Sequence, residues 1–174
     1  MLDIIRINQY IGLRISEILG LLKDNVVFQS DGTVEIKFNE FKKKKERTII
    51  IVNQDAINII NEHLHADKSE KLFGINNYHT FTQALKKIAK DVFKEETIKL
   101  YTVNTSINDY QTVKKCDAIS SHTFRRFAIQ QNIVKYGIDV ARTFSGHTDY
   151  QTITKHYADY INKKDLKGKL LKNQ

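Results

Sequence analysis

The chain has 174 residues, the size of one domain, which is long enough to bury a core and too short to expect two. Lys and Arg number 28 against 20 Asp and Glu, and the net charge of +8 favours a polyanionic partner, nucleic acid first, although a merely lysine-rich surface carries the same charge. Cys116 is the single cysteine, which excludes an intrachain disulfide and zinc sites built on paired cysteines, and no apolar run is long enough to cross a bilayer, so we expect a cytoplasmic protein.

The N-terminal part is predicted to contain helix and a small antiparallel sheet. Residues 2–22 show helical spacing of apolar residues with a break at Gly12. The apolar face expected after this break comprises Ile15, Ile18, Leu19 and Leu22. Three β-rich runs follow at 26–29, 33–38 and 47–52, and a turn separates the first two.

Helical periodicity returns after residue 54. The first apolar stripe comprises Ile57, Ile60 and Leu64, and the second comprises Phe81, Leu85, Ile88, Ala89 and Val92. Thr80 is the predicted N-cap of the second of these helices. Residues 97–118 mix β-branched with polar residues, and we expect an irregular loop or a short extended piece there.

Three more helices are predicted near the C-terminus, at 123–136, 140–144 and 150–160. Gly137 and Gly146 are the expected breaks between them. No proline, internal repeat or linker divides the chain. The fold class predicted is therefore α+β and mainly α, a helical body with a small three-stranded antiparallel sheet.

Four separated segments are rich in groups that bind or cleave phosphodiesters. They are GLRISEILGL around Arg14, FKKKKERTIII around Lys42, SHTFRR around Arg125, and FSGHTDYQTITKHYADY, which contains His147 and Tyr157. A scissile phosphate develops negative charge on its oxygens, and the planar guanidinium group matches those oxygens with a fork of donors. Arg14 and Arg125 are the candidates for such a clamp.

The order of these segments resembles the catalytic domain of the tyrosine recombinase (phage integrase) family over residues 10–160. Arg14 lies in a Gly-Leu-Arg-x-Ser-Glu segment like that of the family. The family's His-x-x-Arg box is present as His122 to Arg125, and His147 stands in a Gly-His-Thr-Asp segment. Each motif alone is common by chance, and their ordered occurrence carries the resemblance.

The resemblance also implies a tyrosine nucleophile. In the family this residue follows the histidine of the Gly-His segment closely, and Tyr157, ten residues after His147, has the family spacing. Tyr150 and Tyr160 are the alternatives. Tyr150 is too close to the histidine for the family spacing, and Tyr160 is equally consistent with a packing residue.

The lysine of the family lies in the turn between the second and third strands, which points to Lys42, with Lys43 as the second choice. Taken alone, the run of four lysines is typical of a solvated hairpin tip. The expected contacts to DNA outside the catalytic set come from Lys43, Lys44, Lys45 and Arg126.

The resemblance implies a division of labour among these residues. His122 takes the proton of Tyr157, Arg14 and Arg125 hold the non-bridging oxygens, His147 donates a hydrogen bond, and Lys42 protonates the leaving 5′ oxygen. Glu17 supports Arg14 or a neighbouring histidine. The product is a 3′-phosphotyrosyl bond, and neither a metal ion, another cofactor nor ATP is expected.

We therefore expect residues 1–174 to form one catalytic domain without the N-terminal DNA-clamping domain of the family, with 161–174 as a flexible or exchanged tail. The implied activity is DNA integration or site-specific recombination in the bacterial cytosol, on double-stranded attachment sites, by a homotetramer of the full-length protein and a monomer alone. The alternatives are a type IB topoisomerase-like enzyme and a noncatalytic basic DNA-binding module. The DNA site and the mobile element stay open.

Overall fold

The computed structural model describes residues 1–40, 45–65, 70–75, 77–101, 110–146, 151 and 153–154. Its elements in chain order are α1 (Leu2–Ile11), α2 (Ile15–Ile18), the 3-10 helix η1 (Lys23–Asn25), β1 (Val26–Phe28), β2 (Val34–Asn39), β3 (Glu46–Ile51), α3 (Gln54–His65), α4 (Tyr78–Phe93), β4 (Thr97–Tyr101), β5 (Tyr110–Lys114), α5 (Lys115–Ala118), α6 (Ser121–Tyr136) and α7 (Ile138–Ser145). The molecule is mostly helical with a small antiparallel sheet, as predicted.

The first helix ends where the sequence predicts a break. Gly12 caps α1 in the left-handed conformation, with φ of 58°, and its amide N–H donates to the carbonyl of Asn8. The chain turns there and enters α2, which is only one turn long and ends at Ile18. The predicted helical face is therefore correct for the buried Ile15, Ile18 and Leu19 but wrong for Leu22, which lies beyond the helix and is 39% exposed.

The three predicted strands form one antiparallel sheet in the order β1, β2, β3. Strand alternation turns Val34, Ile36 and Phe38 of β2 inward. Ile49 and Ile51 of β3 are buried on the same principle, whereas Ile50 points outward. The sheet thus contributes one apolar face to the core and leaves the other face toward solvent.

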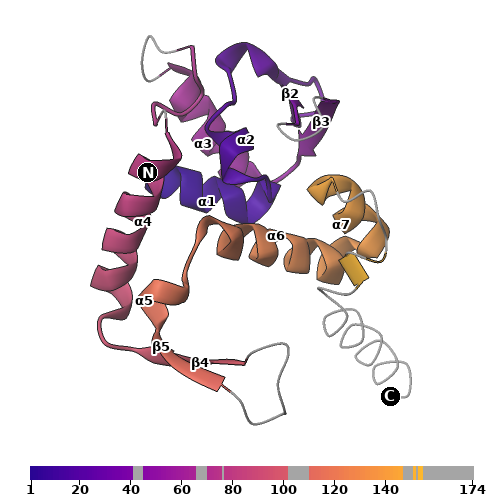
Figure 1. The fold of residues 1–174 in the computed structure, drawn as a ribbon. Coiled ribbons are helices and arrows are strands. Elements are labelled where there is room, and N and C mark those ends of the chain that lie inside the picture. Colours follow the sequence, from indigo (N-terminus) through magenta and orange to yellow (C-terminus); the bar gives the residue numbers. More distant parts are fainter. Residues whose placement is uncertain are drawn as a thin grey trace.

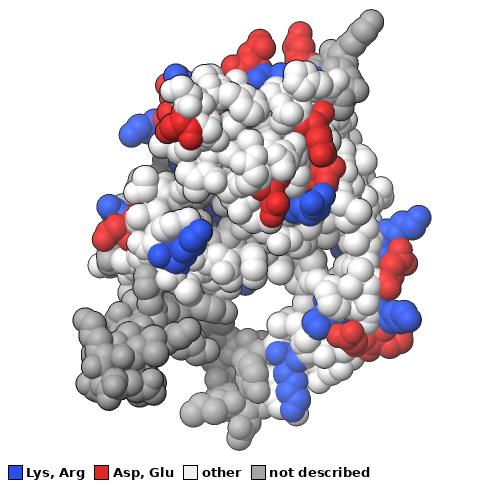
Figure 2. Space-filling view, turned by 180° about the vertical axis from the view of Figure 1, so that it is seen from behind, with Lys and Arg blue, Asp and Glu red and all other residues white. Residues whose placement is uncertain are grey.

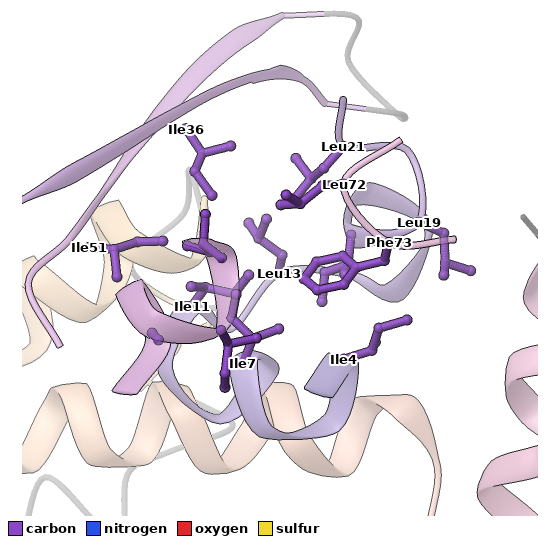
Figure 3. Packing of buried hydrophobic residues seen from close by; sticks show 14 of the residues in the cluster. Ile4, Ile7, Ile11, Leu13, Leu19, Leu21, Ile36, Ile51, Leu72 and Phe73 are labelled. Carbon is purple, nitrogen blue, oxygen red and sulfur yellow. The ribbon is translucent and has the colours of Figure 1, made fainter. Parts of the chain in front are cut away.

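The main core lies between the sheet, α1, α2, α3 and the start of α4 (Figure 3). The labelled side chains that meet there are Ile4, Ile7, Ile11, Leu13, Leu19, Leu21, Ile36, Ile51, Leu72 and Phe73. Helix α6 runs beside α1 through the middle of the molecule and packs against it (Figure 1). A second, smaller cluster joins α6 to α7 and comprises Ile129, Ile133, Ala141 and Ile153.

Helix α4 begins three residues earlier than predicted. Its N-cap is Asn77, whose side-chain oxygen accepts from the backbone N–H of Thr80 at 2.7 Å, so Thr80 is the third residue of the helix and not its cap. Phe81, Leu85 and Ala89 are buried as expected. Val92 departs from the predicted stripe and is 61% exposed, because the last turn extends past the core.

In the described parts of residues 97–118, the chain is extended at 97–101 and 110–114, in agreement with the second of the two predicted alternatives. Strands β4 and β5 pair in register from Thr97 with Lys114 to Tyr101 with Tyr110, and α5 follows directly. This two-stranded ribbon projects from the helical body (Figure 1). Residues 97–100 alternate polar and apolar side chains, whereas residues 110–114 do not, and the side chains described in both strands are largely exposed.

The predicted breaks at Gly137 and Gly146 are confirmed, since both glycines have positive φ and bound α7. Helix α6 begins at Ser121 and α7 is longer at both ends than predicted. Of the helix predicted over 150–160, Gln151, Ile153 and Thr154 are helical, and the remainder lies outside the described residues. None of the helices in the described part of the chain is long and apolar enough to cross a membrane.

Gly12 offers a stability test of the turn between α1 and α2. A Cβ there would lie 3.1 Å from Cβ of Ala128 on α6, and the left-handed φ adds a cost of roughly 1–2 kcal/mol for a residue with a side chain. Gly12→Ala should lower the free energy of unfolding in urea by at least that amount. The control is Gly32→Ala, which has φ of 82° but nothing within 4 Å of the new Cβ and should lose only the backbone part. Equal losses in the two variants would contradict a tight contact with α6.

Candidate functional site

Arg14 is placed by the turn that follows Gly12. It is the N-cap residue of α2, and its side chain is 28% exposed. Its Nη1 donates to Oε1 of Glu17 at 2.9 Å, while its backbone N–H donates to Oε2 of the same carboxylate at 2.8 Å. The Glu17 side chain is fully buried. Glu17 therefore fixes both the main chain and the side chain of Arg14, in keeping with the supporting place predicted for it.

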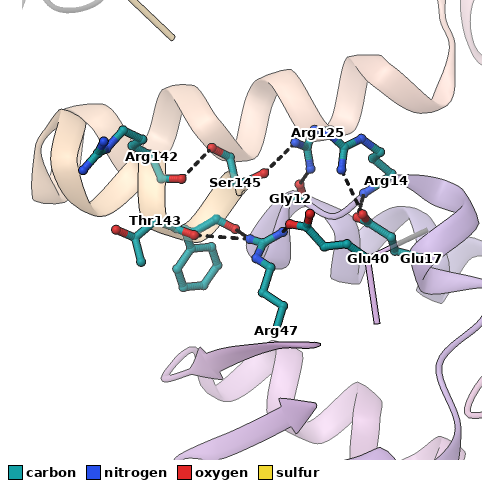
Figure 4. A network of polar contacts seen from close by, with 10 residues as sticks. Gly12, Arg14, Glu17, Glu40, Arg47, Arg125, Arg142, Thr143 and Ser145 are labelled. Atoms are coloured by element: carbon teal, nitrogen blue, oxygen red, sulfur yellow. Dashed lines mark hydrogen bonds and ion pairs between the residues drawn. The ribbon is translucent and has the colours of Figure 1, made fainter. Parts of the chain in front are cut away.

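Arg125 occupies the centre of the candidate site, on the inner face of α6 and buried. Its Nη1 donates to the carbonyl of Gly12 at 2.5 Å and its Nη2 to the carbonyl of Ser145 at 2.7 Å (Figure 4). One guanidinium group thus bridges the end of α1 and the end of α7. It joins the first arginine segment to the residue that directly precedes the Gly-His segment.

A pocket of about 200 Å³ brings the predicted residues of two segments together. Its lining comprises Leu13, Arg14, Ile15, Ser16, Tyr78, Ser121, His122 and Arg125. His122 is exposed in the first turn of α6, one helical turn from Arg125. Two arginines, an imidazole and hydroxyl groups around one small hollow suit an oxyanion such as a phosphate.

The C-terminal end of α7 is held by arginine side chains. The carbonyls of Thr143 and Phe144 accept from Nη2 of Arg47 at 3.3 and 2.5 Å, and the carbonyl of Ser145 accepts from Arg125 (Figure 4). Such carbonyls have no partner within their own helix, and a cation there also matches the negative end of the helix dipole. Two arginines from different elements therefore satisfy the three last carbonyls of α7.

Arg47 was not among the predicted site residues. Its Nη1 pairs with Oε1 of Glu40 at 3.2 Å, and its side chain is 13% exposed. Burial lowers the pKa of Arg47, and the nearby carboxylates of Glu40 and Glu17 oppose this shift. The sequence did hold a signal: strand alternation places Arg47 on the same inward face as Ile49 and Ile51, where a charged group must find a partner.

Lys45 and Arg126, the described residues among the expected DNA contacts, lie on the surface. Arg126 follows Arg125 on α6, and Lys45 directly precedes β3; both are exposed. On the face shown in Figure 2, Lys and Arg side chains are interspersed with Asp and Glu and form no broad basic surface. The DNA contacts expected of Lys45 and Arg126 stay predictions.

Several predicted residues lie outside the described residues. They are Lys42, Lys43, Lys44, His147 and Tyr157, together with the alternatives Tyr150 and Tyr160. Residues 41–44 lie between the described residues Glu40 and Lys45, and the backbone N–H of Glu40 donates to the Lys45 carbonyl at 2.9 Å. Gly146 directly precedes His147. Glu40, next to the undescribed lysines, pairs with Arg47, and Gly146, next to His147, lies against this pair.

A larger cavity of about 410 Å³ lies between α1, β3, α6 and the end of α7, and it contains none of the predicted site residues. Its lining is mainly apolar and includes Ile50, Val52, Phe127 and Tyr10. Burial raises the pKa of Tyr10, and its hydrogen bond to Asp55 acts in the same direction. With Lys135 as its charged lining residue, this cavity suits an apolar group better than a phosphate.

The prediction that no metal is needed rests on the sequence. In the parts of the chain that the structure describes, no three His, Cys, Asp or Glu residues gather as a metal site would require. Glu17 and Glu40 are each paired with an arginine.

Comparison with known proteins identifies the family. Residues 2–163 match the phage integrase family, which is most of the chain, and the protein belongs to this family. The family resemblance inferred from the ordered motifs is thereby confirmed. No curated protein matches the sequence.

Solved structures share the fold at low sequence identity. The XerH site-specific recombinase bound to difH substrate, a pre-cleavage complex, is similar with a TM-score of 0.60 and 15% identity over 87% of this chain and 41% of that one. The post-cleavage complex of XerH with a palindromic difH substrate is similar with a TM-score of 0.64 and 13% sequence identity, over 98% of this chain and 45% of that one. The chain thus spans less than half the length of these recombinases.

The position of Arg125 predicts a cost in stability as well as in chemistry. Arg125→Ala removes this donor from the buried carbonyls of Gly12 and Ser145, and the loss should be about 3 kcal/mol or more, because hydrogen bonds to charged groups contribute about 1.5–3 kcal/mol each. Urea denaturation measures it. The matched control is Arg126→Ala, an exposed neighbour on α6, which should change stability by less than about 0.5 kcal/mol. A similar loss in both variants would argue against the bridge.

Proposed function

We propose that the chain is the catalytic domain of a tyrosine recombinase that cleaves and rejoins DNA at specific sites through a 3′-phosphotyrosyl intermediate. The observation that carries the proposal is the pocket that Arg14, His122 and Arg125 share, although Arg14 and Arg125 are more than a hundred residues apart in the chain. Membership of the phage integrase family supports it. So does the fold shared with XerH in complexes before and after cleavage.

In the proposed reaction the oxygen of Tyr157 attacks the phosphorus of the scissile phosphate and displaces the 5′ oxygen of the next nucleotide. His122 takes the phenol proton, and Lys42 gives a proton to the leaving oxygen. Arg14 and Arg125 stabilise the charge that develops on the non-bridging oxygens, assisted by a hydrogen bond from His147. A 5′ hydroxyl from another strand then reverses the step and restores the phosphodiester.

The hydrogen bonds that fix the side chains of Arg14 and Arg125 favour this chemistry. Arg14 is held by the buried Glu17, and Arg125 by two backbone carbonyls, so neither group must be ordered when the phosphate binds. Donors that are already in place stabilise a transition state without a cost of reorganisation. The proposed substrate is double-stranded DNA carrying attachment sites, the proposed assembly in the full-length protein is a homotetramer, and the proposed location is the bacterial cytosol.

Capture of the covalent intermediate tests the nucleophile. The chain is incubated with a pool of nicked duplexes of randomised sequence, in which cleavage releases a short fragment and traps the protein on DNA. We expect adducts that survive denaturant with the natural chain, none with Tyr157→Phe, and retained adducts with Tyr150→Phe and Tyr160→Phe. Denaturing gels detect the adduct, and sequencing of the trapped DNA identifies the site.

The outcomes separate the rival functions. An adduct that persists in Tyr157→Phe assigns the nucleophile to another residue. DNA binding without any adduct favours a noncatalytic binding module. Relaxation of supercoiled plasmids without a preferred sequence favours the topoisomerase alternative, whereas strand exchange between two duplexes that carry the selected site supports the recombinase.

Phosphate contacts should make binding depend on salt. The logarithm of the binding constant falls with the logarithm of salt concentration in proportion to the number of phosphates contacted. Lys45→Ala and Arg126→Ala should each reduce this slope by about 1, as measured by fluorescence anisotropy with a labelled duplex. Lys90→Ala, an exposed lysine near the far end of α4, is the control. An equal slope for all four proteins would remove Lys45 and Arg126 from the DNA contacts.

A further inference from the structure

Arg47 connects two segments that the proposed reaction needs in fixed relation. It lies in the first part of β3, just after the lysine run, and its guanidinium group reaches the last turn of α7, just before His147. The bonded residues are 96 and 97 positions apart in the chain. The same guanidinium group lies 5.6 Å from the ring centre of Phe38, its partner across the β2–β3 ladder.

The contact is also enforced by space. Gly146 caps α7 in the left-handed conformation, with φ of 69°. A Cβ at this position would collide with Nη1 and Cζ of Arg47 and would lie 2.7 Å from Oε1 of Glu40. The main chain at Gly146 therefore rests directly on the Arg47 and Glu40 pair, and only glycine allows the approach.

The charge balance explains why Arg47 is held so firmly. Two carbonyls of α7 and the carboxylate of Glu40 surround a guanidinium group that is largely removed from water. A buried cation without such partners would be costly, so the partners define one position for it. Figure 4 shows the Arg47 and Glu40 pair in the same polar network as Glu17 and Arg14, and Arg14 lines the pocket.

We propose that Arg47 is a positioning residue of the catalytic site, which holds the end of α7 and the start of the Gly-His segment in register with the β2–β3 hairpin. This inference rests on the proposed recombinase function. Arg47 does not touch the reacting phosphate in this proposal. It sets where the main chain leaves α7 at Gly146, and hence where His147 begins, relative to Arg125 and to the strand that follows the catalytic lysine.

The rate of adduct formation under single-turnover conditions tests the role, with DNA of the selected site in excess. Arg47→Ala should lower the rate constant on the order of 10²-fold, the size expected when a catalytic group is misplaced by about 1 Å. The affinity for DNA and the final yield of adduct, which reports the folded fraction, should stay unchanged. Arg47→Lys keeps the charge without the planar fork and should recover part of the rate.

Two further variants keep the test independent of folding failure. Arg6→Ala removes an exposed arginine of α1 that pairs only with Asp3 among the described contacts, and it should react at the natural rate. Gly146→Ala should slow the reaction in the natural background and add less in the Arg47→Ala background, because Nη1 and Cζ of Arg47, which the new Cβ would meet, are then absent while Oε1 of Glu40 remains.

A natural rate constant in Arg47→Ala or Arg47→Lys, or a loss confined to the yield, would overturn the positioning role while the recombinase proposal stands. Additive effects of Gly146→Ala and Arg47→Ala would overturn it as well. If the natural chain itself forms no adduct, the proposed function fails first, and the positioning role fails with it.

Discussion

The fold around the candidate site depends on the hydrogen bonds that the last backbone carbonyls of α7 accept. The carbonyls of the last three residues need donors, and Arg47 and Arg125 donate to all three. Arg125 is buried and the Arg47 side chain is 13% exposed, so each guanidinium group must itself find acceptors. The same hydrogen bonds give donors to the carbonyls and acceptors to the guanidinium groups, and they join β3, α6 and α7.

In this arrangement Arg125 has two roles, so a substitution there changes both the proposed chemistry and the stability of the fold. The side chain lines the pocket proposed to bind phosphate, and it also bridges Gly12 and Ser145. Removal of the guanidinium group therefore takes away a proposed phosphate ligand and leaves two carbonyls without this donor. A lysine in its place would offer a point charge without the fork that spans both carbonyls. Rate losses at this position must be read together with stability.

The sequence predicted what local patterns and ordered motifs encode. Periodicity located α3, α6 and the three-strand sheet, and glycine positions located the ends of α1 and α7. It was wrong at the start of α4, which Asn77 and not Thr80 caps. For residues 97–118 it left an irregular loop and a short extended piece as alternatives, and the described strands β4 and β5 agree with the second. Arg14, His122 and Arg125 were found by family motifs, whereas Arg47 was missed because its partners are 96 and 97 residues away.

The core and the site are coupled through short stretches of main chain. The packing of Ile7 and Ile11 on α1 fixes Gly12, whose carbonyl accepts from Arg125 and whose turn leads to Arg14. At the opposite side, the inward face of β3 carries Ile49 in the core and Arg47 against α7. Each proposed phosphate ligand or positioning residue is thus one or two residues from a buried apolar side chain or a capped helix end. Close packing of that core permits little drift, so the geometry of the pocket is set before any DNA arrives.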